Sequence, residues 1–228
     1  MRGVLHRSRA SRFAAAIFDL DGTLVDSLPD LAAAMNATLR ALGEPVHPLP
    51  FYLPLIGGGV EVMVAGAIDP DRRSERLVAT AGALMRAHYR RNALRTTRPY
   101  PGVRALLADL TRRRVPMAVL SNKLHPETVH VVRGAFPGVP FRAILGLQPP
   151  RPAKPDPAGI LELCRALRVA PRRVLVVGDG DTDMLAARRA GAWPAGATWG
   201  YRSPRALLAA GAARLAAHPR AVRTYLAA

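Results

Sequence analysis

The chain has 228 residues, half of them hydrophobic, and a formal net charge of +17 at pH 7. This length suits one large α/β domain, with or without an insertion, and the composition supplies a sizeable core. No apolar run approaches the roughly eighteen residues that a membrane span needs. No signal-peptide pattern follows the basic segment 1–12, and the single cysteine, Cys164, excludes an internal disulfide. We therefore expect a cytoplasmic protein that has no membrane partner.

The excess of positive charge is compatible with nucleic-acid binding, a function of a different class from catalysis. The arginines are nevertheless scattered over the expected helices, and the longest cluster, Arg112–Arg114, falls in the last turn of one. We expect no nucleic-acid partner and a basic surface that attracts an anionic substrate. Only Lys123 and Lys154 among the 33 basic residues are lysines, which indicates sites that need a compact ammonium group.

The first expected elements are a buried strand and a helix. The strand covers Ala14–Phe18 and ends at the polar segment Asp19–Ser27. The helix begins near Ser27, where Ser27 and Asp30 fit a capping box. Gly43 follows the last apolar residue of its periodic face and ends it.

Beyond Gly43 the pattern changes twice. Residues 44–59 are rich in Pro and Gly and are expected to be irregular, and Arg98–Gly102 breaks the chain as a linker would. Expected strands and helices alternate after that break. The later strands are expected at Met117–Leu120, Ala143–Leu145, Val174–Val177 and, weakly, Ala197–Trp199. The later helices are expected at about 60–68, 71–94, 102–113, 126–134, 156–168, 182–190, 204–210 and 219–226.

This alternation predicts an α/β fold built on a doubly wound parallel sheet. The all-helical block between the first strand and Pro99 predicts a smaller domain inserted into the larger one. We therefore expect residues 1–26 and 99–228 to form a Rossmann-like core domain and residues 27–98 to form a helical domain.

Two carboxylates, Asp19 and Asp21, stand where the first strand ends. Because the chain turns there, both side chains can converge just past the carboxyl edge of the sheet, where open α/β sheets bind ligands. Two carboxylates repel each other unless a cation joins them. The pair therefore indicates a metal-assisted acid/base or nucleophilic site.

Further polar residues follow the other expected strands. Because the carboxyl ends of parallel strands meet at one edge, we expect these side chains to share a pocket. Hydroxyl, amide and ammonium groups suit phosphate oxygens, and carboxylates suit a hard cation such as Mg²⁺. The residues concerned are Thr23, Ser121, Asn122, Lys154, Asp179, Asp181 and Asp183.

The segment Asp19–Ser27 resembles motif I of the haloacid dehalogenase superfamily without a departure. Ser121 resembles the hydroxyl of motif II, Lys154 the ammonium of motif III, and Asp179 with Asp183 the acidic pair of motif IV. The resemblance covers the core domain in the correct order. One departure is Gly180, where relatives usually carry Ser or Thr.

The resemblance implies a Mg²⁺-dependent phosphatase in which Asp19 attacks phosphorus and Asp21 acts as general acid and base. It also implies that the phosphoryl oxygens are bound by Thr23, Ser121, Asn122 and Lys154. The metal site it implies comprises Asp19, Asp21 through its main-chain carbonyl, Asp179, and Asp183 acting through water or by orienting Lys154.

Softer similarities point to the phosphoglycolate phosphatase branch of this superfamily. They lie in Asp26–Leu31, Leu55–Gly59, Tyr100–Val103 and Trp199–Arg202. They imply that the helical domain is a cap and that the substrate is 2-phosphoglycolate or a similar small anion. The main-chain N–H groups of Gly57, Gly58 and Gly59 could receive its carboxylate; equally, these glycines could merely form a hinge or a helix start. Lys123 could face the substrate or support the phosphoryl site from behind.

Several alternatives stay open at this point. They are a phosphatase for another small phosphate ester, a sugar phosphomutase, a pyrophosphatase and, from a different class, a nucleic-acid-binding protein. Cap specificity depends on loops that follow no transferable code. The expected assembly is a monomer or a homodimer.

Overall fold

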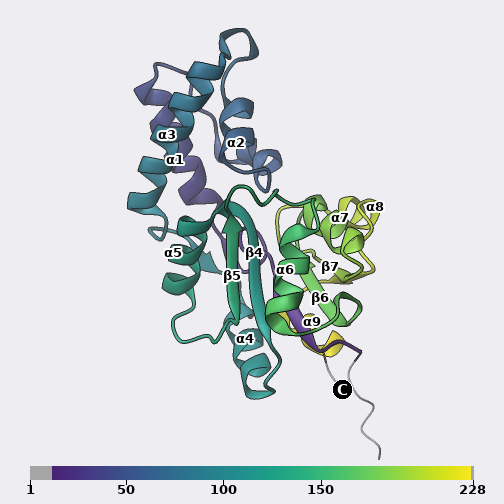
Figure 1. Ribbon diagram of the computed structural model, residues 1–228. Helices are drawn as coiled ribbons and strands as arrows, with labels where there is room; N and C mark the ends of the chain where they lie inside the picture. The colour runs from purple at the N-terminus through teal and green to yellow at the C-terminus, as the bar shows by residue number, and fades with distance from the viewer. Residues whose placement is uncertain (1–11, 227–228) are drawn as a thin grey trace, which may run out of the picture.

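The computed structural model describes residues 12–226, and the lower half of Figure 1 shows a sheet with helices packed on it. The six strands of this sheet are β1 Ala15–Phe18, β4 Met117–Leu124, β5 Ala143–Leu147, β6 Val174–Gly178, β7 Trp193–Ala197 and β8 Arg214–Ala216. They are parallel and lie in the order β5-β4-β1-β6-β7-β8. The strand order therefore reverses at β1, and open α/β sheets bind ligands at the carboxyl edge beside such a point.

Helices cover both faces of the sheet. They are α4 Val103–Arg112, α5 His125–Ala135, α6 Ala158–Leu167, α7 Asp181–Arg189, α8 Pro204–Ala209 and α9 Pro219–Tyr225. Ala15 and Ile17 of β1 belong to one buried hydrophobic cluster, with residues of α6 and α7. Ala16 and Phe18 belong to another, with residues of α4, α5 and α9. A strand buried on both faces needs a continuous apolar run, which explains why β1 lacks polar residues. The predicted doubly wound parallel sheet is confirmed.

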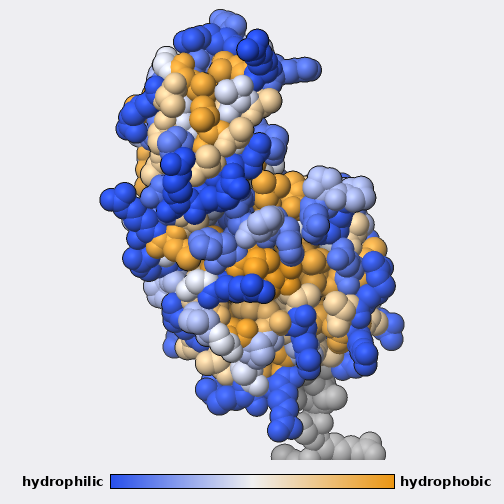
Figure 2. All heavy atoms as spheres, turned by 60° about the vertical axis from the view of Figure 1, so that its left-hand side comes forward, coloured by the Kyte–Doolittle hydropathy of each residue, from blue (hydrophilic) through white to orange (hydrophobic). Residues whose placement is uncertain are grey.

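A helical unit lies above the carboxyl edge of the sheet (Figure 1). It consists of α1 Leu28–Ala41, the 3-10 helix η1 Leu49–Leu55, α2 Val60–Ala67, the 3-10 helix η2 Pro70–Arg72 and α3 Glu75–Asn92. Both α1 and α2 pack against α3. Figure 2 shows this unit as a separate lobe, with hydrophobic side chains visible where it meets the sheet lobe.

Two short antiparallel strands, β2 Val25–Asp26 and β3 Arg98–Pro99, join the helical unit to the sheet lobe. The chain thus enters and leaves the unit side by side. The predicted domain boundaries, 26/27 and 98/99, fall at this ladder, and the division into two domains stays a prediction.

The capping box predicted at the start of α1 is wrong. Ser27 is the N-cap residue but makes no side-chain capping bond. Its hydroxyl instead donates to Asp21 Oδ1 at 2.5 Å, and the Asp30 carboxylate accepts hydrogen bonds from Thr96 and Thr97. The Ser27 hydroxyl and the Asp30 carboxylate, which a capping box would use, therefore bond to residues outside α1.

The strand predicted at Ala197–Trp199 is also misplaced, because β7 covers Trp193–Ala197. Its Gly and Pro residues are typical of turns, yet Trp193 and Pro194 pair with Leu175 and Val176 of β6. The strands β2, β3 and β8 were not predicted. They have two or three residues each and are defined by their partners rather than by periodicity.

No helix within residues 12–226 is long and apolar enough to cross a membrane. Cys164 is buried in α6 among core residues. The expectation that no signal peptide is present concerns segment 1–12, and residues 1–11 lie outside the described part of the chain.

Candidate active site

A pocket lies between the carboxyl edge of the sheet and the helical unit. Its sheet side contains most of the residues singled out in the sequence. These are Asp19, Asp21, Ser121, Asn122, Lys123, Lys154, Asp179, Gly180, Asp181 and Asp183. The opposite wall is mainly apolar and comes from the helical unit: Leu31, Leu55, Ile56, Val60, Met63 and Met85.

Three buried carboxylates meet on the sheet side of this pocket. Asp19 follows β1, Asp179 follows β6, and Asp183 lies in the first turn of α7. Each offers an oxygen, and these oxygens lie within 4.8 Å of one another. The Lys154 ammonium donates to Asp19 Oδ1 at 2.7 Å and to Asp183 Oδ1 at 2.6 Å. Residues from three separate segments of the chain thus form one charged cluster.

The charges of this cluster do not balance. Burial raises the pKa of Asp19 well above its usual value, and the neighbouring Asp183 carboxylate adds to the shift. Burial likewise raises the pKa of Asp179 to about 7. Burial opposes the charge on Lys154, but the carboxylates of Asp183 and Asp19 outweigh it, so the Lys154 pKa is raised. Three carboxylates around one ammonium leave uncompensated negative charge, and a hard divalent cation with oxygen ligands fits this donor set.

Asp179 is held from two sides. Its Oδ1 accepts a hydrogen bond from the Thr23 hydroxyl at 2.8 Å, and its Oδ2 accepts one from the Tyr201 main-chain N–H at 2.9 Å. Gly22 has φ +86°, and a Cβ there would lie 2.2 Å from Asp179 Oδ2. Only glycine permits this approach. The Thr23 hydroxyl, which we expected to bind phosphate, donates to the Asp179 carboxylate in this structure.

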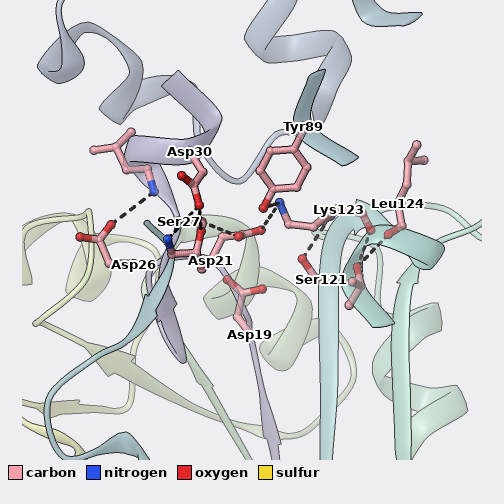
Figure 3. A network of polar contacts seen from close by, with 12 residues as sticks. Asp19, Asp21, Asp26, Ser27, Asp30, Tyr89, Ser121, Lys123 and Leu124 are labelled. Atoms are coloured by element: carbon pink, nitrogen blue, oxygen red, sulfur yellow. Dashed lines mark hydrogen bonds and ion pairs between the residues drawn. The ribbon is translucent and has the colours of Figure 1, made fainter. Parts of the chain in front are cut away.

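The Asp21 side chain has its own partners, Ser27 and Lys123, as Figure 3 shows. It accepts from Ser27 Oγ and forms an ion pair of 3.2 Å with Lys123 Nζ. The same ammonium donates to the Tyr89 hydroxyl of α3 at 3.1 Å. Burial opposes the charge on Lys123, but Asp21 and Tyr89 together outweigh it, so the Lys123 pKa is raised. Lys123 therefore links Asp21 to the helical unit.

Ser121 and Asn122 follow the part of β4 that pairs regularly with β5, which ends at Leu120. Their side chains have different roles. The Ser121 hydroxyl oxygen accepts from the Lys123 main-chain N–H at 3.1 Å and lines the pocket. The Asn122 amide donates to the main-chain oxygens of Gly57 and Lys154 at 2.8 and 2.9 Å and accepts from the Lys154 N–H at 2.8 Å. With these partners the Asn122 side chain positions two loops and has no amide hydrogen left for phosphate.

The glycine loop of the helical unit reaches the same pocket. Gly57 and Gly59 line it, and both have positive φ, +98° and +89°. Gly59 is the N-cap of α2, and a Cβ on Gly58 would lie 2.8 Å from Val62. The helix-start interpretation of these glycines is therefore confirmed for Gly59, and contact between their N–H groups and a substrate stays a prediction.

Several pocket residues were not predicted as site residues, although Tyr201 and Arg202 lie in a segment that carried the resemblance. They are Arg86, Tyr89, Glu127, Tyr201 and Arg202. Burial raises the pKa of Tyr89 to about 12 and also raises the pKa of Glu127. Arg86 forms an ion pair of 3.3 Å with Glu61. Arg86 and Tyr89 lie on α3, which is rich in arginine and alanine, and Glu127 lies on α5. No local pattern marks these three residues.

Comparisons with known proteins agree with this geometry. A family model of haloacid dehalogenase-like hydrolases matches residues 13–191. The phosphoglycolate phosphatase of Haemophilus influenzae is 38% identical over 194 residues, with 81% of this chain and 85% of that protein covered. Phosphoglycolate phosphatase 1 of Pseudomonas aeruginosa is 39% identical over 194 residues, with 83% and 71% covered. A crystal structure of a predicted phosphoglycolate phosphatase from Haemophilus somnus matches with a TM-score of 0.87 at 28% identity, over 94% of this chain and 98% of that one.

The chain belongs to the haloacid dehalogenase-like hydrolases. Three observations are consistent with this family: the strand order, the buried acidic cluster and the matched region. The relatives quoted above carry the name phosphoglycolate phosphatase, so the resemblance to that branch is confirmed as well.

Proposed function

We propose that this chain is a Mg²⁺-dependent phosphatase that hydrolyses 2-phosphoglycolate to glycolate and phosphate. The observation that carries the proposal is the buried arrangement of Asp19, Asp179 and Asp183 around the Lys154 ammonium. The names of the matched relatives support the choice of substrate. The position of the helical unit over the pocket supports the assignment of residues 27–98 as a cap domain.

The proposed reaction has two displacements at phosphorus. An Asp19 carboxylate oxygen attacks the phosphorus, the bond to the ester oxygen breaks, and Asp21 gives its proton to the leaving glycolate oxygen. Asp21 then takes a proton from a water, which attacks the phosphorus of the aspartyl-phosphate. This second step releases phosphate and restores the Asp19 carboxylate. Lys154 and the Ser121 hydroxyl bind the phosphoryl oxygens during both steps.

The residues that would hold the metal are Asp19, Asp179 and Asp183, whose oxygens already lie close together. When bound, Mg²⁺ would neutralise negative charge on the transferring phosphoryl group. In this proposal Thr23 and the Tyr201 N–H fix the orientation of the Asp179 carboxylate toward that position.

We propose that Arg86 receives the carboxylate of the substrate. Among the cations that line the pocket, Lys123 and Lys154 are paired with aspartates and Arg202 donates to main-chain carbonyls. Within the described residues, the ion pair of Arg86 is with Glu61, whose side chain is 66% exposed. Exposed ion pairs contribute little, so an anionic substrate can compete for this guanidinium.

Initial rates on a panel of phosphate esters test the reaction. The panel contains 2-phosphoglycolate, ethyl phosphate, a sugar phosphate and pyrophosphate, each with and without Mg²⁺. We expect Mg²⁺-dependent phosphate release, fastest from 2-phosphoglycolate, and loss of activity in Asp19→Asn but not in the control Asp71→Asn, which lies in the exposed η2. Full activity of Asp19→Asn, or preference for pyrophosphate, would contradict the proposal. So would sugar-bisphosphate interconversion without release of phosphate.

A matched pair of arginine variants tests the carboxylate contact. Replacing Arg86 by Met removes one charged hydrogen bond, so we expect kcat/KM for 2-phosphoglycolate to fall about 10- to 100-fold. The rate for ethyl phosphate, which has no carboxylate, should stay near that of the wild type. Arg90→Met is the control, because Arg90 is exposed one turn further along α3 and donates to the Arg86 main-chain oxygen. Equal losses for both substrates would assign Arg86 a structural role instead.

A further inference from the structure

The segment Trp199–Arg202 joins β7 to α8 and lies next to the proposed metal site. Trp199 Nε1 donates to the main-chain oxygen of Thr23 at 3.0 Å. A Cβ on Gly200 would lie 2.3 Å from both Asp179 Cβ and the Gly22 oxygen. The main chain of the segment therefore packs directly against the loop after β1 and against the Asp179 carboxylate.

Tyr201 contacts two parts of the molecule with two different groups. Its main-chain N–H donates to Asp179 Oδ2. Its hydroxyl oxygen accepts from the N–H groups of Ser27 and Leu28, both at 3.1 Å, and donates to Asp26 Oδ1 at 3.0 Å. The N–H groups at a helix start lack partners within the helix, so this phenol satisfies the first donors of α1.

Arg202 reaches the far side of the pocket. Its guanidinium donates to the main-chain oxygens of Leu53 at 2.7 Å and of Pro54 and Ile56 at 3.0 Å. These carbonyls lie at the end of η1, directly before the glycine loop. The Asn122 amide donates to the next carbonyl, that of Gly57. Planar fork geometry suits several acceptors at once, and all four bonds would break if this loop moved away from the sheet.

We propose that Trp199–Arg202 is a positioning segment that couples the metal-binding carboxylate Asp179 to the closed position of the helical unit. The closed position is the one in this structure, in which the loop after η1 is bonded to Arg202 and Asn122. One stretch of four residues fixes Asp179 through a main-chain N–H, the start of α1 through a phenol, and the loop after η1 through a guanidinium. Coupling between two sites is reciprocal. Metal bound at Asp179 therefore favours closure, and closure raises the affinity for metal. The inference depends on the proposed metal site but not on the identity of the substrate.

The coupling is tested with substrate-free protein and Mg²⁺ alone. In the wild type, we expect saturating Mg²⁺ to slow hydrogen exchange at residues 27–28 and 53–59. In Arg202→Met this protection at 53–59 should disappear, and the dissociation constant for Mg²⁺ should rise about 5-fold or more. Tyr201→Phe, which keeps the main-chain N–H to Asp179, should lose the protection at 27–28. Arg205→Met, in the exposed first turn of α8, is the control and should behave as the wild type.

Kinetics give an independent readout. Because Arg202 acts on closure and not on the reacting atoms, Arg202→Met should raise KM for the phosphate ester more than it lowers kcat, and Arg202→Lys should restore part of the loss. Unchanged Mg²⁺ affinity together with retained protection in Arg202→Met would overturn the coupling. Circular dichroism confirms that each variant is folded. Metal binding and exchange need no turnover, so absence of phosphatase activity would overturn the proposed function and leave the coupling measurable.

Discussion

Lys154 is the ammonium that lies between the carboxylates of Asp19 and Asp183. Replacement by Met keeps most of the length of the side chain and removes its charge. Removing one partner of a buried ion pair costs about 3 kcal/mol or more, so we expect the free energy of unfolding of the metal-free protein to fall by that order. Urea denaturation measures this loss. Added Mg²⁺ should recover part of it by supplying positive charge to the same carboxylates.

The same substitution should also lower kcat about 100- to 1000-fold, because it removes the donor that we propose for the phosphoryl oxygens. Arg165→Met, a change at an exposed position of α6, serves as the control for both measurements. A Lys154→Met protein with unchanged stability and kcat would show that the cluster needs no internal cation.

Metal affinity should depend on pH through Asp179. Burial raises its pKa to about 7, so the metal-free protein holds a proton there below that pH. Metal binding must displace this proton, and it must also displace the proton that the raised pKa of Asp19 favours. We expect the affinity for Mg²⁺ to fall about tenfold or more for each pH unit below about 7. Titration calorimetry between pH 5.5 and 8.5 measures the slope. A constant affinity over this range would contradict the assignment of Asp179 as a ligand.

The stability of the metal-free protein should depend on pH in the opposite direction from the affinity for Mg²⁺. Asp179 has a raised pKa in the folded state, so between its ordinary value of 3.8 and about 7 the folded chain binds more protons than the unfolded one. The contribution of Asp179 to the stability of the metal-free protein therefore decreases as pH rises through that window. Saturating metal should remove this decrease.

The sequence could identify Asp19 and Asp179 because they directly follow strands, which hydrophobic runs reveal. It could identify Lys154 because that residue is one of only two lysines. It could not assign the Asn122 amide to the Gly57 and Lys154 carbonyls, because that depends on how a loop of the helical unit meets β4. Arg86 was missed for a similar reason. Its direction into the pocket depends on the rotation and docking of α3, which a single helix pattern does not define.

The joint between the helical unit and the sheet lobe depends on Asp30 of α1. This carboxylate accepts from the main-chain N–H groups and hydroxyls of Thr96 and Thr97, so it ties the start of the unit to its end. Removing it leaves the donors of the buried Thr97 unpaired, together with those of Thr96. We expect Asp30→Ala to lower the free energy of unfolding by about 3 kcal/mol, as measured by urea denaturation.

The control for this change is Asp69→Ala, which removes only the exposed N-cap of η2 and should cost about 1 kcal/mol or less. Burial opposes ionisation of Asp30, but its hydrogen bonds outweigh burial and lower its pKa. The stabilising contribution is therefore present above the ordinary value of 3.8 and is lost as pH falls through the lower folded value. Equal stability of the two variants at pH 7 would show that the joint does not depend on Asp30.

Helices with a sustained apolar face were predicted with ends within a few residues of those observed, as for α1, α3 and α4. The elements that were predicted wrongly or missed are those whose boundaries depend on hydrogen bonds to other segments of the chain. Trp193 and Pro194 become a strand only because β6 supplies the ladder, and β2 with β3 exists only where the two ends of the helical unit meet. Ser27 likewise bonds Asp21 rather than its own helix.

The pocket as a whole is made from both lobes, and this explains what the sequence leaves open. Its polar side comes from strand ends, and its apolar wall comes from α1, α2 and α3. The chemistry could be inferred from the first group alone. The shape that selects a substrate depends on how the second group is placed over it, and that placement is a property of the tertiary structure.

The net charge of +17 should influence how fast the substrate arrives. 2-Phosphoglycolate carries both phosphate and carboxylate charges, and the field of a basic protein raises the local concentration of such an anion. Raising the ionic strength from about 0.01 to 0.3 M shortens the screening length several-fold, so we expect kcat/KM to fall about tenfold. Once the substrate is bound, kcat should change little. Ethyl phosphate carries less charge and should show a shallower dependence in the same salt series. Identical slopes for the two esters would mean that salt acts on the protein and not on attraction of the anion.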